Sequence, residues 1–374
     1  MIIFLAHLFL YSLRSFAFFF GSNFREKKKN TVFQNSQNLK FSIVVPARNE
    51  EKNIENCIVS LSELNFNDNE YEIIIVDDDS TDNTKNIIQG LSEEISNLRL
   101  ISSDINYNSK HKNLKGKAGA IDTGIKSART EIILMTDADC TFHPDWASSI
   151  LSEFSEDGKA FVASFTLVAA HNIFAQIQNY EWIFMHTMAR AGVGLGWPVG
   201  CFGNNIAIRK SVYQEIGGYE NLPFSVTEDL SLQLAVASKF SAQQSSGLSY
   251  PCSVQMTVTT APCPTFSEYL KQHHRWAIGG QRLGLRATIF VLVSAMAWAS
   301  VFYNFWTANY NLAILTILLK VFGDFLVIFP SLIRLKLKKL WLWHLPSVLF
   351  FMIMELVIPI LLLKKEVSWK GRKF

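Results

Sequence analysis

The chain has 374 residues, of which 49% are hydrophobic, and a formal net charge of +3. Its length allows one large domain or two smaller ones with a substantial core, and the small charge argues against a nucleic-acid partner. The five cysteines contain no C-x-x-C pair, so the sequence predicts neither a disulfide framework nor a zinc site.

The N-terminal segment is apolar and of nearly the length that spans a bilayer. Its apolar run covers residues 2–20, and we expect residues 1–22 to form a transmembrane or interfacial helix. Arg25 and the three lysines at 27–29 follow this run. By the positive-inside bias, these basic residues place the next domain in the cytoplasm.

Three apolar blocks, at 287–306, 311–333 and 340–363, predict a C-terminal transmembrane region over residues 287–363. Lys320 and Asp324 are four residues apart, so they share one helix face and could pair within the bilayer. Three complete spans would leave the basic tail at 364–374 on the side opposite the catalytic domain, against the positive-inside bias. We therefore expect one block, and first of all the last, which contains prolines, to be re-entrant, interfacial or broken.

Between the apolar ends, short apolar segments alternate with amphipathic helical ones, which predicts βαβ units and a mostly parallel sheet with helices on both faces. This α/β domain is expected at about residues 40–260, followed by an amphipathic interfacial segment at 261–286. Strands are predicted at 41–45, 72–76, 98–101 and 132–135, and helices end near Leu64, Ile95 and Ala128.

Acidic residues follow two of these strands, at Asp77 to Asp79 and at Asp137 and Asp139. Ligands of open α/β sheets bind at the carboxyl ends of the strands. Asp137 and Asp139 can face the same way, and so could bind one cation or one polar ligand. Lys117 begins a helix beside glycines, where an ammonium and backbone N–H groups could meet a diphosphate. Asp82 is better explained as a helix cap.

Later motifs have ordinary structural explanations when each is taken alone. Gly203 and Asn204 end a glycine-dense loop that could be merely flexible. Glu228 and Asp229 could be acids favoured at a helix start. The segment around Trp276 could be an interfacial anchor.

Taken in order, the motifs resemble family 2 glycosyltransferases, above all membrane-embedded members such as ceramide glucosyltransferases and the cellulose and hyaluronan synthases. The resemblance covers roughly residues 40–280, and the tail at 369–372 is similar to a basic Trp-Gly-Arg element of related enzymes. The chain departs from the family at Asp79, where Gly or Asn is usual. The motifs are Pro46-Ala47-Arg48-Asn49-Glu50, Val76-Asp77-Asp78-Asp79-Ser80-Thr81-Asp82, Lys117-Ala118-Gly119-Ala120, Asp137-Ala138-Asp139, Thr227-Glu228-Asp229 and Gln272-x-x-Arg275-Trp276.

The resemblance implies a GT-A fold, a nucleotide-sugar donor, with UDP-sugars favoured, and Mg²⁺ or Mn²⁺ held by Asp137 and Asp139. The catalytic residues that it implies are Asp229 and Glu228, with Asp229 as the general base of an in-line displacement that inverts the anomeric configuration. The residues implied on the donor side are Pro46, Ala47, Arg48, Glu50, Asp77, Asp78, Lys117 and Asp137. Those implied on the acceptor and diphosphate side are Gly203, Asn204, Gln272, Arg275 and Trp276.

We therefore expect an integral membrane enzyme, in a bacterial inner membrane, that transfers sugar to a lipid or lipid-linked glycan acceptor at the cytoplasmic face. A processive polysaccharide synthase is the near alternative, since Gln-x-x-Arg-Trp is shared with polymerising enzymes. The small number of apolar blocks favours the lipid acceptor over a polymer channel. A nucleotidyltransferase and a non-catalytic membrane scaffold are disfavoured by the later motifs and by the complete set of acids.

Overall fold

The computed structural model of the chain describes residues 2–23, 39–104, 110–155, 159–240, 247–370 and 372–373. The basic residues at 25–29, which carry the predicted orientation of the N-terminal helix, lie outside this part. Contacts divide the chain into two compact units. Unit 1 comprises Met1–Glu26, Ala170–Gly200 and Phe266–Lys365, and unit 2 comprises Lys27–Ala169, Cys201–Thr265 and Glu366–Phe374.

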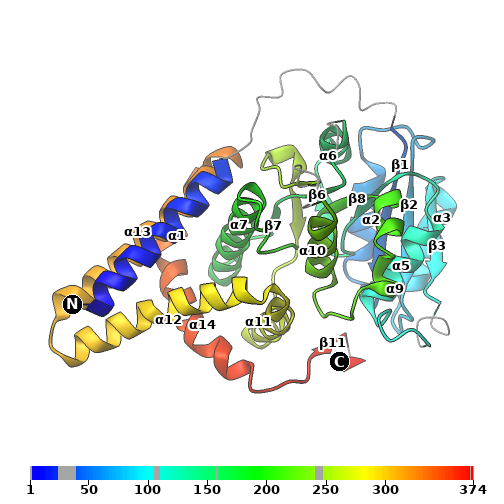
Figure 1. Cartoon of the computed structure of the whole chain (residues 1–374). Helices are drawn as coiled ribbons and strands as arrows, with labels where there is room; N and C mark the ends of the chain where they lie inside the picture. The colour runs from blue at the N-terminus through cyan, green and yellow to red at the C-terminus, as the bar shows by residue number, and fades with distance from the viewer. Residues whose placement is uncertain are drawn as a thin grey trace. The chain divides into compact units, whose positions relative to one another are not determined.

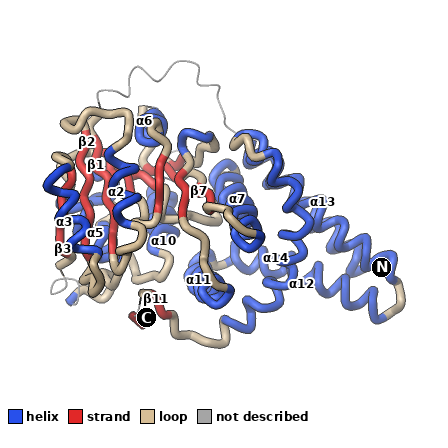
Figure 2. The backbone as a smooth tube through the Cα atoms, turned by 180° about the vertical axis from the view of Figure 1, so that it is seen from behind, coloured by secondary structure: helices blue, strands red, loops and turns tan. Residues whose placement is uncertain are grey.

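Unit 2 is built around a seven-stranded sheet in the order β3-β2-β1-β4-β8-β6-β9 (Figures 1 and 2). The first four strands are mutually parallel, whereas β8 runs antiparallel to both β4 and β6. The predicted mostly parallel α/β sheet is thus confirmed. The strands are β1 (Phe41–Ala47), β2 (Tyr71–Asp77), β3 (Leu98–Ser102), β4 (Ile132–Met135), β6 (Phe161–Ala163), β8 (Ile206–Arg209) and β9 (Leu248–Ser249).

Helices cover both faces of this sheet because alternate side chains of each strand point to opposite sides. On one face, Ile43 and Ile73 pack with Leu61 of α2 in the main hydrophobic core. On the other face, Gly124 of α5 lies against Val44 and Val76. The helices of unit 2 are α2 (Ile54–Ser62), α3 (Thr84–Glu94), α5 (Lys117–Ser127), α6 (Trp146–Phe154), α8 (Lys210–Glu215), α9 (Gly218–Asn221) and α10 (Glu228–Phe240).

Two smaller sheets complete unit 2. One has the order β5-β10-β7, formed by β5 (Cys140–Phe142), β7 (Thr166–Val168) and β10 (Val258–Thr260). The other is a hairpin of β11 (Ser368–Trp369) and β12 (Arg372–Lys373) at the C-terminus. The five cysteines have free thiols in this structure.

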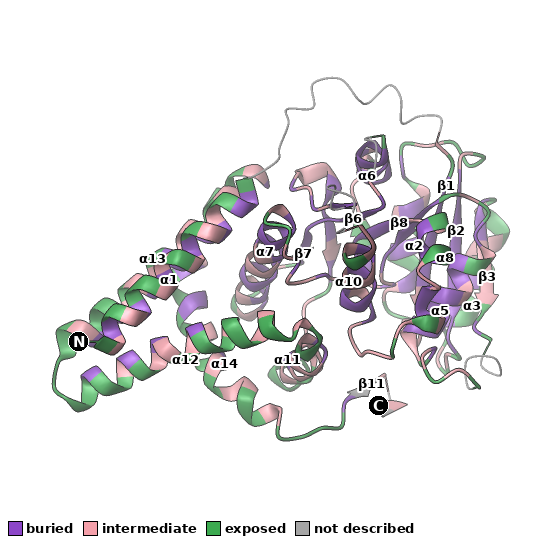
Figure 3. Cartoon of the chain, viewed as in Figure 1, coloured by how far each residue is buried: buried purple, intermediate pink, exposed green. Residues whose placement is uncertain are grey.

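Unit 1 is helical, and within its described residues four apolar segments are long enough to cross a membrane: 2–23, 285–306, 310–334 and 338–361. Figure 3 shows exposed residues along these helices, whereas the strands of unit 2 are mostly buried. The exposed side chains include many large apolar ones, such as Leu285 and Trp306. Helices of this kind suit an apolar surrounding. The helices of unit 1 are α1 (Ile2–Asn23), α7 (Ile173–Gly194), α11 (Phe266–Gly280), α12 (Leu285–Trp306), α13 (Tyr310–Arg334) and α14 (His344–Leu361).

The predicted pair of Lys320 and Asp324 forms within α13, with 3.4 Å between Nζ and Oδ2. Arg14 of α1 adds a second cation, 2.5 Å from Asp324 Oδ1. Tyr11 donates to the same oxygen, and Lys320 also meets Glu355 of α14 at 2.8 Å. Charges in an apolar setting are stable only when paired, so this network joins α1, α13 and α14.

Candidate active site

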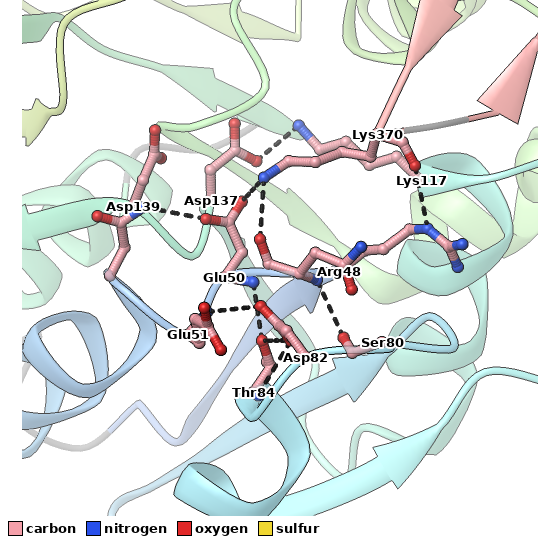
Figure 4. A network of polar contacts seen from close by, with 12 residues as sticks. Arg48, Glu50, Glu51, Ser80, Asp82, Thr84, Lys117, Asp137, Asp139 and Lys370 are labelled. Atoms are coloured by element: carbon pink, nitrogen blue, oxygen red, sulfur yellow. Dashed lines mark hydrogen bonds and ion pairs between the residues drawn. The ribbon is translucent and has the colours of Figure 1, made fainter. Parts of the chain in front are cut away.

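The loops that follow β1 and β2 are tied together by hydrogen bonds (Figure 4). The backbone N–H of Asn49 donates to Ser80 Oγ, and that of Glu50 donates to Thr84 Oγ1. Asp82 accepts from the backbone N–H of Glu51 and from that of Thr84, the first residue of α3, whereas the N-cap position is Asn83. The two loops therefore form one rigid edge at the carboxyl ends of the strands.

Arg48 braces this edge through backbone contacts. Its guanidinium donates to the carbonyl oxygens of Asp78 and, at 2.9 Å, of Asp79. Asp79 has a φ of 61°, a left-handed conformation that Gly and Asn adopt most readily. This backbone conformation accounts for the Gly or Asn that is usual at this position, and here Asp79 adopts it instead. Pro46 and Ala47 pair in register with Val76 and Asp77 of β2.

The three consecutive acids differ sharply in exposure. Asp77 and Asp78 are buried, whereas the Asp79 side chain is 56% exposed. Asp77 accepts from the backbone N–H of Ser80 at 3.3 Å. Burial raises the pKa of Asp78, although Arg372, 2.5 Å away, lowers it in part. Asp77 and Asp78 are thus the acids held at fixed positions in the edge.

Lys117, the first residue of α5, lies between carboxylates. Its Nζ is 2.6 Å from Asp137 Oδ1 and 3.4 Å from Glu228 Oε1. Burial alone would lower the pKa of Lys117, but Asp137 and Glu228 hold it well above its usual range. Glu228 therefore pairs with the lysine that the sequence placed on the donor side, a contact that the motifs did not predict.

Asp139 lies in the turn between β4 and β5, where Thr260 of β10 donates to its Oδ2 at 3.0 Å. Burial, together with the neighbouring Asp137 and Glu50, raises the pKa of Asp139 to about 6. Carboxylates that destabilise one another in this way fit a hard divalent cation. The described residues contain no cluster of three or more His, Cys, Asp or Glu ligands. A cation here would therefore need donor oxygens from a ligand or water.

Asp229 is in the first turn of α10, as the sequence suggested for a helix start. Its Oδ1 accepts from the backbone N–H of Leu230 at 2.7 Å. A Cβ at Gly203 would lie 3.3 Å from Asp229 Oδ2 and 3.4 Å from Lys117 Nζ. Gly203 thus lets the backbone approach both groups closely, and the structure brings these three predicted residues together.

Asn204 is buried and turned into the domain. Its carbonyl oxygen accepts from Thr136, and its side-chain oxygen accepts from Thr166 at 2.9 Å. These bonds give Asn204 a clear structural role next to Gly203.

Gln272, Arg275 and Trp276 lie on α11 of unit 1. Trp276 packs edge-on against Trp182 of α7, with ring centroids 5.5 Å apart. Within unit 1, Glu181 of α7 joins α11 by accepting from Tyr269 at 2.9 Å and from His273 at 2.8 Å.

Both ring nitrogens of His273 face acceptors, Glu181 and the carbonyl oxygen of Tyr269. In its protonated form His273 donates from both nitrogens, to Glu181 and to the Tyr269 carbonyl oxygen. Burial would lower the pKa of His273, but Glu181 raises it. The sequence motif contains His273 but gave no sign of this buried ion pair.

The chain matches the family model described as glycosyl transferase family 2 over residues 42–217 and the one described as glycosyl transferase family group 2 over residues 132–357. The second match covers more than half of the chain. The chain belongs to glycosyltransferase family 2. The motifs that follow the strands and begin α5 and α10 thus identified the family of this glycosyltransferase correctly.

Curated relatives include the probable glycosyltransferase YdaM of Bacillus subtilis, 27% identical over 72% of this chain and 62% of its own length. The β-monoglucosyldiacylglycerol synthase of Nostoc is 28% identical over 64% of this chain and 48% of its own length. The matched part thus spans less than two thirds of either relative.

A solved structure shares the fold of this glycosyltransferase. The mannosyltransferase PcManGT of Pyrobaculum calidifontis, determined with GDP-mannose and Mn²⁺, has a TM-score of 0.62 at 15% sequence identity. The similarity covers 97% of this chain and 95% of that one. The predicted GT-A fold with terminal apolar helices is confirmed.

Proposed function

We propose that this glycosyltransferase moves a sugar from a nucleotide-sugar donor to a lipid acceptor at the cytoplasmic membrane face, with inversion at the anomeric carbon. The observation that carries the proposal is the placement of Lys117, Asp137, Glu228 and Asp229 around one point at the carboxyl ends of the strands. Asp77 and Asp78 lie at the carboxyl end of β2, which β1 separates from β4, and there they can accept hydrogen bonds from a nucleoside. A UDP-sugar is the first donor to test.

Asp229 is proposed as the general base. The acceptor oxygen forms a bond to the anomeric carbon while the bond from that carbon to the diphosphate oxygen breaks. The acceptor proton passes to the Asp229 carboxylate, and the bonding electron pair leaves with the diphosphate. Such proton transfer is typically worth about 10²- to 10⁴-fold in rate.

Lys117 and Glu228 complete this arrangement. The ammonium of Lys117 is aimed at the carboxylates and is fixed by them, so it is available to the departing diphosphate without reorganisation. Glu228 fixes Lys117 rather than taking a proton itself. Asp137 and Asp139 are the residues that would hold Mg²⁺ or Mn²⁺, and the cation would neutralise charge on the diphosphate.

A lipid acceptor is supported by the membrane-like helices of unit 1 and by a relative that is named for a glycolipid. The C-terminal hairpin contacts Glu50 and Asp78 inside unit 2. These contacts support the proposal that the tail and the glycosyltransferase domain lie on the same side of the membrane. Three complete crossings between Thr265 and the tail would put the tail and the glycosyltransferase domain on opposite sides of the membrane. The hairpin contacts therefore favour two crossings and one apolar segment that does not span.

The test uses full-length protein in detergent, a panel of UDP- and GDP-sugars, diacylglycerol in mixed micelles, and release of nucleoside diphosphate as the readout. We expect release from one donor that requires Mn²⁺ or Mg²⁺ and stops with EDTA. Asp229→Asn should lower transfer by about 10²-fold or more while donor affinity changes little. Asp68→Asn, on the exposed surface, is the matched control.

Transfer by Asp229→Asn at the wild-type rate would show that another group is the base. Glycolipid formation with the donor's configuration retained would refute the single displacement. If soluble polymer accumulates without any glycolipid, the lipid acceptor is wrong and the chain is a polysaccharide synthase.

A further inference from the structure

The C-terminal hairpin is a defined element at the far end of the chain. Ser368 pairs with Lys373, and Trp369 pairs with Arg372, in antiparallel register. Lys370, in the connecting turn, has a φ of 46°, which costs a non-glycine residue about 1 kcal/mol. A two-stranded hairpin is at best marginally stable by itself. Contacts with the rest of unit 2 must therefore hold this one in place.

Those contacts are made with the loops that follow β1 and β2. Lys370 Nζ lies 2.8 Å from Glu50 Oε1 and donates to the carbonyl oxygen of Asn49 at 3.3 Å. Arg372 Nη1 lies 2.5 Å from Asp78 Oδ2. The hairpin thus reaches two residues that the sequence placed in the donor site, more than 290 positions earlier in the chain.

Two further contacts set the hairpin against the same edge. Arg48 donates from Nε to the carbonyl oxygen of Lys370 at 3.5 Å. The second terminal nitrogen of Arg372 is 3.9 Å from the Asp79 carboxylate. The side chains of Lys370 and Arg372 are about 30% exposed, so both are reachable from solvent while paired.

The charge balance of this edge gives the hairpin a role. An anionic nucleoside diphosphate is repelled by carboxylates unless cations offset them. Arg48 and Lys117 supply positive charge from the domain, and the hairpin adds Lys370 and Arg372. The carboxylates at this edge are Glu50, Glu51, Asp77, Asp78, Asp79, Asp82, Asp137, Asp139, Glu228 and Asp229.

We propose that the hairpin is part of the donor site: Lys370 binds the diphosphate of the nucleotide, and Arg372 positions Asp78 for the nucleoside. This inference rests on the proposed nucleotide-sugar donor. An ammonium has three donors and a guanidinium five, so each can keep its carboxylate and still donate to a ligand. Arg372 also lowers the pKa of Asp78 against the effect of burial, which favours the ionised form that accepts hydrogen bonds.

The test measures binding of UDP and of GDP, each with Mn²⁺, to full-length protein in detergent by calorimetry. Lys370→Ala and Arg372→Ala are each expected to weaken the dissociation constant of the bound nucleotide by about tenfold. Arg372→Lys should recover part of the loss because it keeps the charge. Lys365→Ala removes an exposed charge from the same tail outside the hairpin and should leave the dissociation constant unchanged.

Turnover separates binding from folding. The two alanine variants should raise the KM for the donor and change kcat little, with a melting temperature close to that of wild type. Affinity equal to wild type in both variants would overturn the inference and leave the proposed function standing. Tighter binding by Arg372→Ala would also overturn it, because the hairpin would then exclude the donor. A wild-type protein that neither binds UDP or GDP nor turns over any nucleotide-sugar would refute the proposed function itself.

Discussion

Asp139 is expected to reduce the stability of the protein in the absence of a cation, so that Asp139→Asn stabilises the fold while it removes function. Burial, with Asp137 and Glu50 close by, raises the pKa of Asp139 from 3.8 to about 6. This rise corresponds to about 3 kcal/mol of folding free energy at neutral pH. The amide loses a charge-assisted bond from Thr260, so the expected net gain is about 2 kcal/mol.

The sign of this effect gives a pH signature. Below the unfolded pKa, Asp139 is protonated in both states and costs nothing. As the pH rises from the unfolded value of 3.8 to the folded value of about 6, the unfolded state ionises while the folded state keeps its proton, so the cost grows and is fully present above about 6. The gain from Asp139→Asn should therefore be large at about pH 7.5 and small at about pH 4.5.

The assay is thermal unfolding in detergent with EDTA, followed by tryptophan fluorescence. At about pH 7.5 the variant should melt roughly 2–4 °C above wild type for each kcal/mol gained. Added Mn²⁺ should stabilise the wild type and not the variant. Asp68→Asn on the exposed surface should change neither the melting temperature nor the stabilisation by Mn²⁺. A variant less stable than wild type at about pH 7.5, or one whose gain is independent of pH, would refute the reasoning.

Four other substitutions probe the packing of the fold and its charged groups. Gly124→Ala would put a Cβ 2.4 Å from Val44 Cγ1, so chemical denaturation should show a free energy of unfolding lower by about 1–3 kcal/mol. Gly90→Ala has open space around the new Cβ and should raise the free energy of unfolding by about 0.5–1 kcal/mol. The pKa of His273 is higher in the folded state than in the unfolded state. Its ion pair with Glu181 therefore stabilises the fold fully below the unfolded-state pKa, and this stabilisation is lost as the pH rises through the folded-state pKa. His273→Gln should therefore lower the melting temperature more at about pH 6 than at about pH 9, and an equal loss at both would contradict the assignment. Lys117→Met leaves carboxylates without their cation, so calorimetry with UDP and Mn²⁺ should show at least about tenfold weaker binding, and unchanged affinity would remove this lysine from the donor site.

The local pattern of the sequence was sufficient to predict the sheet and the residues at its edge. Runs such as Ile132 to Met135 are apolar throughout because both faces of a central strand are buried. Acids that follow β2 and β4 must then share one edge, since parallel strands end on the same side. This is why Asp77, Asp78 and Asp137 could be named together, and why the family could be identified from them.

The partners of those residues depended on the path of the whole chain. Thr260 meets Asp139, Glu228 meets Lys117, and Arg372 meets Asp78. Each pair joins segments more than a hundred residues apart in sequence, and no periodicity or motif specifies which distant side chains meet. The sequence alone determined that a nucleotide-sugar enzyme lies between membrane-like helices. Tertiary folding decided that the C-terminal hairpin returns to the carboxyl ends of β1 and β2, where Lys370 and Arg372 pair with Glu50 and Asp78.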